Sequence, residues 1–309
     1  MIPPHLELND GNRMPQLGLG TFQVPARLTM PTVLNALSTG YRMVDTAAAY
    51  RNEAEVFQAV RRSNFNRKNV FITTKLSNND HGRTGTIRGV QRSVKRLGGG
   101  YIDLYLIHWP LPLRDRYVET WLALTELKAR GLARSIGVAN FEIEHLERII
   151  DASGVVPAVN QVELHPHMQQ AELRRFHVAH GIATEAWSPL EQGRILHDPV
   201  IKDLARSSGR TPAQIVLRWQ LQLGNIAIPK SITPGRIEEN FAVFDFELGD
   251  DEMRAISTLE TGQRIGGDPA TFAGPHGVRR ALSVALDRYP AAEPIALVAR
   301  RTVDRVRKG

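Results

Sequence analysis

Residues 102–139, IDLYLIHWPLPLRDRYVETWLALTELKARGLARSIGVA, decide the fold of this chain. The run Ile102–Trp109 is compact and apolar, as expected of a strand buried on both faces in a parallel sheet. A helix follows over Arg114–Arg130, with Gly131 as its stop signal. Ala133–Ala139 is a second strand of the buried type. A strand, a helix and a strand in this order are typical of α/β folds with parallel strands.

The same alternation continues on both sides of this segment. A further helix is expected over Thr211–Leu223, where Thr211 is the N-cap and Pro212 the first helical residue. Besides the two runs above, the candidate strands are Leu17–Val24, Tyr41–Ala47, Val70–Leu76, Ala158–Leu164, Ala183–Ser188 and Ile226–Pro229. Such a series of strand–helix alternations predicts a (β/α)8 TIM barrel rather than an open doubly wound sheet.

Two segments lie outside this repeat. Near the N-terminus, His5–Leu8 and Met14–Leu17 flank the turn sequence Asn9–Asn12, which predicts a β-hairpin that plugs the bottom of the barrel. Residues 273–309 carry eight basic and three acidic side chains, a net charge of +5 out of +7 for the whole chain. Apolar residues recur there at helical spacing. We therefore expect a barrel domain over residues 1–272 and a basic helical extension over residues 273–309.

Composition excludes several classes of protein. The 309 residues contain no cysteine, which excludes disulfides, thiolate nucleophiles and cysteine-bound metal centres. No apolar run is long enough to span a bilayer, and the N-terminus lacks the pattern of a secretory signal. The basic extension has almost no aromatic residues, which argues against nucleic-acid binding. These features predict a cytoplasmic protein, a monomer or weak oligomer in which the extension is a candidate contact.

Candidate catalytic residues follow three consecutive strands, where functional groups of a barrel gather. The second strand is followed by Asp45 and Tyr50, the third ends at Lys75 and the fourth at His108. Singly, each is more often structural, but together they face one mouth. Hydride transfer to a carbonyl needs a proton donor at the oxygen, and Tyr50 fits this role. We expect Lys75 to lower the pKa of the phenol and Asp45 to hold Lys75. His108 would fix the substrate oxygen or relay a proton.

These residues occur in phrases that resemble the aldo-keto reductase superfamily, most closely its bacterial members similar to 2,5-diketo-D-gluconate reductase. The phrases are Leu17–Phe22, Asp45–Glu53, Thr74–Leu76, Asp103–Pro110, Gly137–Phe141, Asn160–Glu163 and Ile228–Ser231. They run in order from about Leu17 to about Phe272, so a chance match is improbable. The resemblance implies the same catalytic tetrad. It also implies NADPH-dependent reduction of aldehydes, ketones and small dicarbonyls, keto-sugar acids among them.

The resemblance further implies a nicotinamide site. In it, Asn140 and Gln161 hold the carboxamide and Trp187 stacks on the ring, while Phe22 and Trp109 form an apolar wall on the substrate side. The other cofactor contacts that it implies are Gly20, Thr21, Ser188, Leu190, Glu239 and Asn240, the last two at the adenine.

The phosphate end of the cofactor can also be argued from chemistry. Lys230, Ser231 and Arg236 follow the eighth strand, where barrels commonly bind phosphate beside a short helix, opened here by Thr233-Pro234. A guanidinium pairs with phosphate through two hydrogen bonds, so we expect NADPH to be preferred over NADH. No Gly-x-Gly-x-x-Gly motif precedes a helix, so the cofactor site is not of the Rossmann type.

Some residues depart from this pattern or compete with it. Ala139 stands where the family usually has Ser, and the loss of one hydroxyl contact would weaken cofactor binding by about 0.5–1.5 kcal/mol. His165-Pro166-His167 resembles the metal-binding pair of barrel hydrolases, but no later strand end adds a histidine. We interpret this pair as structural or loop-lining and expect no metal. His177 and His180 are expected to face solvent.

Two alternative functions stay open. A cofactor-sensing binding or regulatory protein on the same fold would retain the tetrad, so the sequence discriminates poorly against it. The second alternative, a metal-dependent barrel hydrolase, is disfavoured because the sequence does not supply a complete set of metal ligands. Fold does not fix the substrate; Arg114 and Arg116 favour an acidic substrate if they face the mouth.

Overall fold

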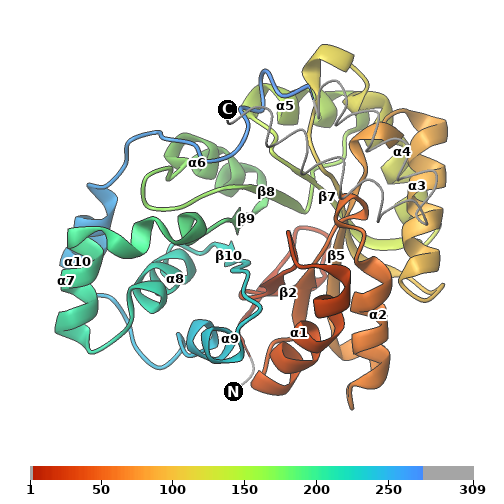
Figure 1. Ribbon diagram of the computed structural model, residues 1–309. Helices are drawn as coiled ribbons and strands as arrows, with labels where there is room; N and C mark the ends of the chain where they lie inside the picture. The colour runs from red at the N-terminus through yellow and green to blue at the C-terminus, as the bar shows by residue number, and fades with distance from the viewer. Residues whose placement is uncertain (1–2, 274–309) are drawn as a thin grey trace, which may run out of the picture.

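The computed structural model describes residues 3–273, and eight parallel strands form its centre (Figure 1). In chain order these strands are β3 (Leu19–Gly20), β4 (Met43–Asp45), β5 (Phe71–Leu76), β6 (Ile102–Ile107), β7 (Ala133–Ala139), β8 (Val159–Glu163), β9 (Ala183–Trp187) and β10 (Ile226–Ala227). Each strand pairs with the next one along the chain. A parallel bridge between Leu17 and Ala227 joins the first strand region to the last. The sheet is thereby closed, and the predicted TIM barrel is confirmed.

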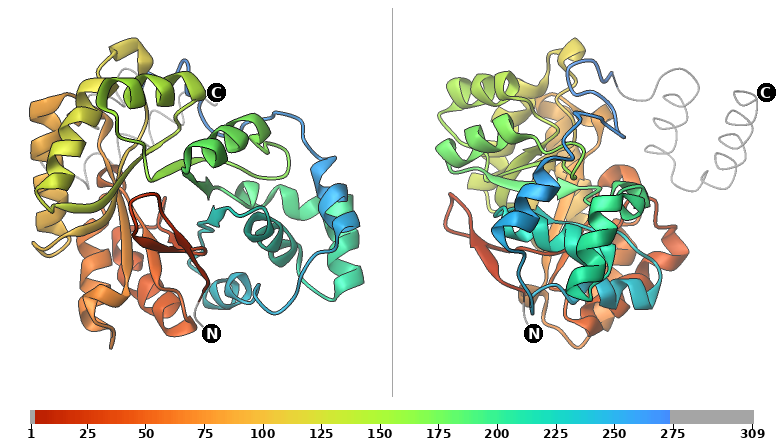
Figure 2. Two further views of the ribbon diagram at one scale, coloured as in Figure 1. Left: turned by 180° about the vertical axis from the view of Figure 1, so that it is seen from behind. Right: turned by 90° about the vertical axis from the view of Figure 1, so that its left-hand side faces the viewer.

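Helices surround this sheet and return the chain from one strand to the next (Figures 1 and 2). The α-helices of the described part are α1 (Ala26–Thr39), α2 (Glu53–Arg62), α3 (Arg83–Arg96), α4 (Tyr117–Ala129), α5 (Ile143–Ser153), α6 (Ala171–His180), α7 (Pro199–Ser208), α8 (Pro212–Gln222), α9 (Pro234–Phe241) and α10 (Asp250–Ser257). Short 3-10 turns are η1 (Ala48–Tyr50), η2 (Arg67–Asn69), η3 (Asn78–Asp80), η4 (Pro112–Arg114), η5 (Glu191–Gly193) and η6 (Ile195–His197). The Thr211 cap and Pro212 start of α8 are as predicted.

Strand β6 illustrates how the apolar runs fill two cores. Leu104 and Leu106 belong to an inner cluster together with Met43 and Val159 of other strands. The alternate residue Tyr105 is also fully buried, but it belongs to the larger cluster formed with the helices. Since successive side chains of a strand point to opposite faces, both faces of the sheet are covered. This leaves the strand ends as the places where polar groups gather.

The N-terminal hairpin covers the end of the barrel at which the strands begin. Its strands β1 (His5–Glu7) and β2 (Arg13–Pro15) pair antiparallel, and they cross that end in the view from behind (Figure 2). Leu8 and Met14 are buried within the inner cluster. The Asn12 side chain donates to the Arg134 carbonyl oxygen at the start of β7. The hairpin therefore plugs the bottom of the barrel, as predicted, and the catalytic candidates lie at the other end.

Most predicted boundaries lie within two residues of those in the structure, and two elements differ by more. The helix expected from Arg114 begins at Tyr117, because Pro112–Arg114 is a 3-10 turn and Asp115 has a positive φ of 45°. Leu17–Val24 was expected as one strand, but only Leu19–Gly20 pairs as β3. A turn directly after Gly20 explains this: the Val24 backbone N–H donates to the Thr21 carbonyl oxygen, and Gln23 has a positive φ of 58°.

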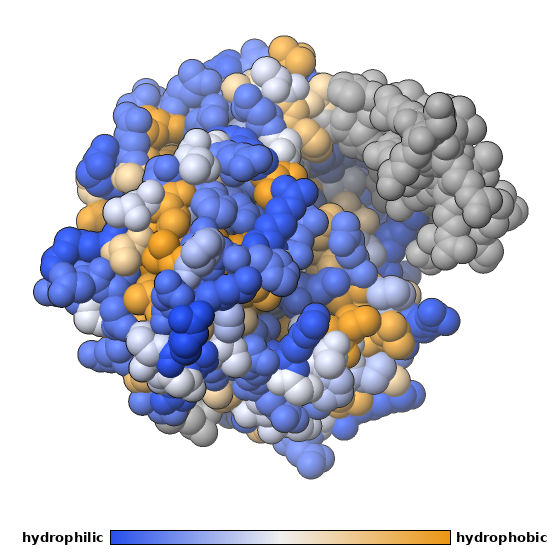
Figure 3. All heavy atoms as spheres, turned by 60° about the vertical axis from the view of Figure 1, so that its left-hand side comes forward, coloured by the Kyte–Doolittle hydropathy of each residue, from blue (hydrophilic) through white to orange (hydrophobic). Residues whose placement is uncertain are grey.

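Polar and charged residues cover much of the face drawn in Figure 3, and hydrophobic residues form small groups between them. Among residues 3–273 no helix has the length and apolar character needed to cross a membrane. The predicted basic extension, from 273 onward, lies outside the described residues except for its first position, and its helices are therefore not described.

Candidate active site

A buried ion pair between Lys75 and Asp45 forms the base of the site. Asp45 is the last residue of β4, and Lys75 lies near the end of the neighbouring strand β5. The Lys75 ammonium lies 2.6 Å from both carboxylate oxygens and 3.0 Å from the Thr46 carbonyl oxygen. Burial disfavours the ammonium, but the carboxylate of Asp45 outweighs this and raises the pKa of Lys75. Lys75 is therefore a fixed positive charge inside the barrel.

Tyr50 stands beside this charge. It ends the 3-10 turn η1 that follows β4, and the Lys75 ammonium lies 5.1 Å from the centre of its ring. Burial raises the pKa of Tyr50 above that of a free phenol, and Lys75 offsets part of this rise. The expected net lowering of this pKa is therefore wrong, because burial raises it by more than the ammonium of Lys75 lowers it. Tyr50 is a neutral phenol over the physiological pH range and can donate a proton.

His108 follows β6 and meets Tyr50 edge-on, with 5.7 Å between the ring centres. Burial, helped by the positive charge of Lys75, lowers the pKa of His108 to about 3. A neutral imidazole can donate one hydrogen bond, and its Nδ1 has no partner among the described residues. The structure thus brings together all four predicted tetrad residues. It also makes His108 a hydrogen-bonding group rather than a cation.

The residues predicted to hold nicotinamide come from the next three strands. Asn140 follows β7; its side-chain nitrogen donates to the His108 carbonyl oxygen at 2.9 Å, and its oxygen accepts from the Trp187 indole at 2.8 Å. Gln161 of β8 donates to Asp45 at 2.9 Å and to Glu185 at 2.8 Å. These contacts place Asn140, Gln161 and Trp187 around the tetrad at one mouth.

Two other predicted cofactor residues are built into the barrel wall. The hydroxyl and the backbone nitrogen of Thr21 both donate to the Asp45 carbonyl oxygen. Gly20 lies against the Ile228 backbone, since a Cβ at this position would be 2.9 Å from the Ile228 carbonyl oxygen. Ser188 and Leu190 precede a turn in which Glu191 and Gln192 have positive φ angles of 52° and 54°.

The predicted phosphate group lies around the start of α9. Lys230 and Arg236 are exposed, and neither forms an ion pair within the described part of the chain. The Ser231 hydroxyl accepts a hydrogen bond from the Thr233 backbone, which fixes the turn before the helix. Glu239 is held by the Thr211 hydroxyl at 2.7 Å, and Asn240 is buried. Two unpaired cations beside a helix N-terminus are suited to a phosphate.

Aromatic side chains border the tetrad on the substrate side. Phe22 is 51% exposed and lies 5.1 Å, ring centre to ring centre, from Tyr50. Trp109 stacks on Phe272, with ring centres 4.1 Å apart. The two arginines considered for an acidic substrate have partners: Arg114 donates to the Asn78 carbonyl oxygen, and Arg116 pairs with an acidic side chain, that of Glu119.

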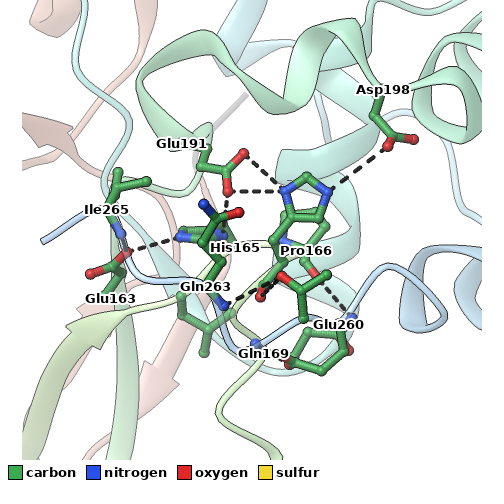
Figure 4. A network of polar contacts seen from close by, with 12 residues as sticks. Glu163, His165, Pro166, Gln169, Glu191, Asp198, Glu260, Gln263 and Ile265 are labelled. Carbon is green, nitrogen blue, oxygen red and sulfur yellow. Dashed lines mark hydrogen bonds and ion pairs between the residues drawn. The ribbon is translucent and has the colours of Figure 1, made fainter.

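His165 and His167 belong to a chain of carboxylates rather than to the tetrad (Figure 4). His165 lies 3.0 Å from Glu163 and 3.2 Å from Glu191. His167 lies 3.0 Å from the same oxygen of Glu191. Glu163 also accepts the backbone N–H groups of Ile265 and Gly266. These contacts fit the structural interpretation, because they fasten the turn at Glu191 and the segment near Ile265 to the end of β8.

Two residues were misjudged or overlooked at the sequence level. His177 is fully buried between Asn160 and the Thr184 hydroxyl, so its predicted exposure is wrong; its neighbour His180 is exposed. Glu185 of β9 is fully buried and faces Gln161. The signal was present, since Glu185 stands two residues before Trp187 in a strand, and residues two apart share a face.

Comparison with known proteins identifies the family to which this chain belongs. A family model described as the aldo/keto reductase family matches residues 16–261. The chain belongs to this family.

This chain matches relatives in the aldo/keto reductase family over nearly the whole length of those relatives. An aldo-keto reductase of Mycolicibacterium smegmatis is 54% identical over 88% of this chain and 98% of its own. Methylglyoxal reductase DkgA of Escherichia coli is 51% identical over 88% of this chain and 99% of its own. The crystal structure of a Gox0644 mutant in complex with NADPH shares 48% identity, covers 88% of this chain and 99% of its own, and has a TM-score of 0.85.

Proposed function

We propose that this chain is an NADPH-dependent reductase that converts aldehydes, ketones and small dicarbonyls to alcohols. The observation that carries the proposal is the arrangement of Tyr50, a neutral phenol, beside the Lys75–Asp45 ion pair and the neutral His108. A proton donor, a fixed positive charge and a neutral hydrogen-bond donor converge there on one point. This is what a carbonyl oxygen requires as it gains negative charge.

NADPH would supply the hydride. The residues present fit it: Lys230 and Arg236 are unpaired exposed cations within the described chain, suited to the phosphate. The Gln161 side-chain oxygen accepts no hydrogen bond from residues 3–273, which leaves it open to the carboxamide. We assign the nicotinamide end to Asn140, Gln161 and Trp187. The further cofactor contacts of this proposal are Gly20, Thr21, Ser188, Leu190, Ser231, Glu239 and Asn240.

In the mechanism, the chain's own residues place and protonate the substrate oxygen. His108 donates a hydrogen bond to that oxygen, and Phe22 and Trp109 exclude water from the apolar side of the substrate. Tyr50 gives its hydroxyl proton to the oxygen as the carbon–oxygen double bond is reduced. Lys75, held by Asp45, stabilises the phenolate that results until solvent returns the proton.

Small neutral dicarbonyls are the substrate class that we favour. The relative named methylglyoxal reductase supports this choice. A keto-sugar acid is less supported, because Arg116 is paired with Glu119 and Arg114 with backbone oxygen atoms. The absence of cysteine fits a reducing cytoplasm, which we propose as the compartment. We also propose residues 1–272 as the catalytic domain, active as a monomer or weak oligomer.

The test is a panel of carbonyl substrates, followed through the loss of NADPH absorbance for the wild type and Tyr50→Phe. We expect Tyr50→Phe to lower turnover by about 10²–10⁴-fold, because the proton donor is lost, and to leave the NADPH dissociation constant nearly unchanged. Tyr101→Phe, at the other end of the barrel, is the matched control and should keep wild-type turnover. Tight NADPH binding without turnover on any substrate would instead indicate a cofactor-sensing protein.

A further inference from the structure

Glu185 is a second buried carboxyl group beside the proposed catalytic tetrad, which already contains Asp45. It lies in the middle of β9 with no exposed surface, on the inner side of the barrel. One of its oxygens accepts from Gln161 at 2.8 Å, and the other has no hydrogen-bond partner among the described residues. A buried carboxyl group costs free energy of folding unless it is paired. Its presence therefore requires an explanation other than stability.

Hydrogen bonds connect Glu185 to Lys75 through Gln161 and Asp45, and Lys75 lies beside the ring of Tyr50. Gln161 donates from one nitrogen to both Glu185 and Asp45, and Asp45 holds Lys75 beside Tyr50. The orientation of the Gln161 amide follows from Asp45, because the carboxylate that pairs with Lys75 can only accept a hydrogen bond. Gln161 is thus fixed between two acids, and its own oxygen is turned away from them.

We propose that Glu185 is a positioning residue that keeps Tyr50 protonated at alkaline pH and so favours carbonyl reduction over alcohol oxidation. The inference rests on the function proposed above. Glu185 would act through charge and through Gln161, without touching the substrate.

The charges around Glu185 set the order in which the groups lose their protons. Burial, followed by the negative charge of Asp45, raises the pKa of Glu185 to about 8, while Gln161 and Lys75 oppose this rise. Near neutral pH Glu185 is therefore a neutral carboxyl group beside the Lys75–Asp45 ion pair. As the pH rises, Glu185 ionises before Tyr50, whose own pKa is raised by burial.

The ionised Glu185 then acts on Tyr50. Its negative charge raises the pKa of Tyr50, as the charge of Asp45 also does, and so opposes the formation of a phenolate. Reduction requires the protonated phenol, whereas the reverse reaction requires the phenolate as a base. Glu185 therefore extends the pH range of reduction upward and moves the onset of oxidation to higher pH.

Glu185→Gln tests this, because it keeps the size and a hydrogen-bond acceptor but removes the charge. The ionisation of Tyr50 is read from the ultraviolet difference titration of the cofactor-free protein against the same protein with Tyr50→Phe. We expect the midpoint to fall by about one pH unit in Glu185→Gln. Asp103→Asn is the matched control: Asp103 is also a buried carboxylate, but it lies at the start of β6 and pairs with Arg67. It should leave the midpoint unchanged.

The pH profiles of the cofactor-loaded enzyme give the second readout. In Glu185→Gln, the alkaline limb of carbonyl reduction and the rise of alcohol oxidation should both move to lower pH by the same amount as the Tyr50 midpoint. At an alkaline pH between the wild-type and variant midpoints, the ratio of oxidation to reduction should then rise about tenfold. Glu185→Asp, which keeps the charge, should restore most of the wild-type profile.

The outcomes separate the two proposals. If the wild type reduces carbonyls and the Tyr50 midpoint is the same in Glu185→Gln, the inference about Glu185 is wrong and the function stands. If no carbonyl is reduced, the function fails, and the cofactor-free titration still tests Glu185. Should the variant not fold, carbon-13 NMR of labelled glutamate in the wild type follows Glu185 itself. An ionisation midpoint near 8 is expected, and an ordinary glutamate value would overturn the inference.

Discussion

Lys75 is one of the largest fully buried side chains of the described structure, and it owes its place to a second layer of contacts. Its ammonium donates to the Thr46 carbonyl oxygen as well as to Asp45. The Thr46 hydroxyl donates to Asn52 at 2.6 Å, and the Asn52 amide donates to the Thr21 carbonyl oxygen. Thr46 and Asn52 flank the 3-10 turn that carries Tyr50, and the hydrogen bond between them closes this turn. This explains how residues from two strands and a 3-10 turn hold one geometry.

We expect the cofactor site to be weakest at Ala139, and Ala139→Ser tests this. The side chain is fully buried at the end of β7, beside the position proposed for the carboxamide. We expect Ala139→Ser to lower the NADPH dissociation constant about two- to tenfold, because one hydroxyl contact contributes about 0.5–1.5 kcal/mol. Fluorescence titration with NADPH measures the change, and turnover should vary little.

The control for this variant is Ala186→Ser. Ala186 is equally buried but belongs to the cluster between sheet and helices, on the other face of β9 from Glu185 and Trp187. A buried hydroxyl there should lower thermal stability and leave NADPH affinity as it was. Equal affinities in Ala139→Ser and the wild type would mean that position 139 does not face the carboxamide.

We propose that the choice between NADPH and NADH depends on helix α9. Arg236 lies in its first turn, exposed and without an ion pair in the described structure. We expect Arg236→Ala to weaken NADPH binding about tenfold and to leave NADH binding unchanged, because only NADPH carries the additional phosphate. Dissociation constants for both cofactors measure this.

Arg254→Ala is the matched control, since Arg254 is an exposed helical arginine of α10 that pairs with Asp251. Arg254→Ala should leave the dissociation constants of NADPH and NADH unchanged. A preference for NADPH that survives in Arg236→Ala would remove the arginine from the phosphate site and leave Lys230 as the candidate.

Elements were predicted from sequence where a short-range pattern defines them. The apolar run of β6 and the Thr211-Pro212 start of α8 carry their signals within a few residues. The burial of His177 depends instead on contacts with two strands outside its own helix. Its helix pattern alone does not reveal that Asn160 and Thr184 bind both ring nitrogens.

The same limit applies to the site. The gathering of Tyr50, Lys75, Asp45 and His108 at one mouth was predictable, because a closed barrel turns all its strand ends to one mouth. The carboxylate network around Glu191 was not, since its partners come from separate loops (Figure 4). The direction of the Tyr50 pKa also needed the structure, because burial opposes the effect of Lys75.

Buried neutral histidines make the stability of the whole protein sensitive to acid. Burial lowers the pKa of His177 to about 3, and it does the same for His108. The unfolded chain has an ordinary histidine pKa of about 6.5, so below that pH it binds protons that the folded protein excludes. Their contribution to stability is therefore complete above about pH 6.5 and is lost as the pH falls toward the folded pKa values. Each such histidine lowers the free energy of unfolding by about 1.4 kcal/mol per pH unit in this window.

His177→Gln isolates one of these contributions. At neutral pH the variant should be less stable than the wild type, because Asn160 and Thr184 lose a matched partner. Near pH 5 the difference should shrink by about 1.4 kcal/mol or more, since the wild type alone carries the unfavourable histidine. Urea unfolding at the two pH values measures this. His180→Gln, exposed on the same helix, should follow the pH dependence of the wild type. If the gap for His177→Gln stays constant with pH, His177 is not held neutral in the folded barrel, and its burial does not account for the acid sensitivity.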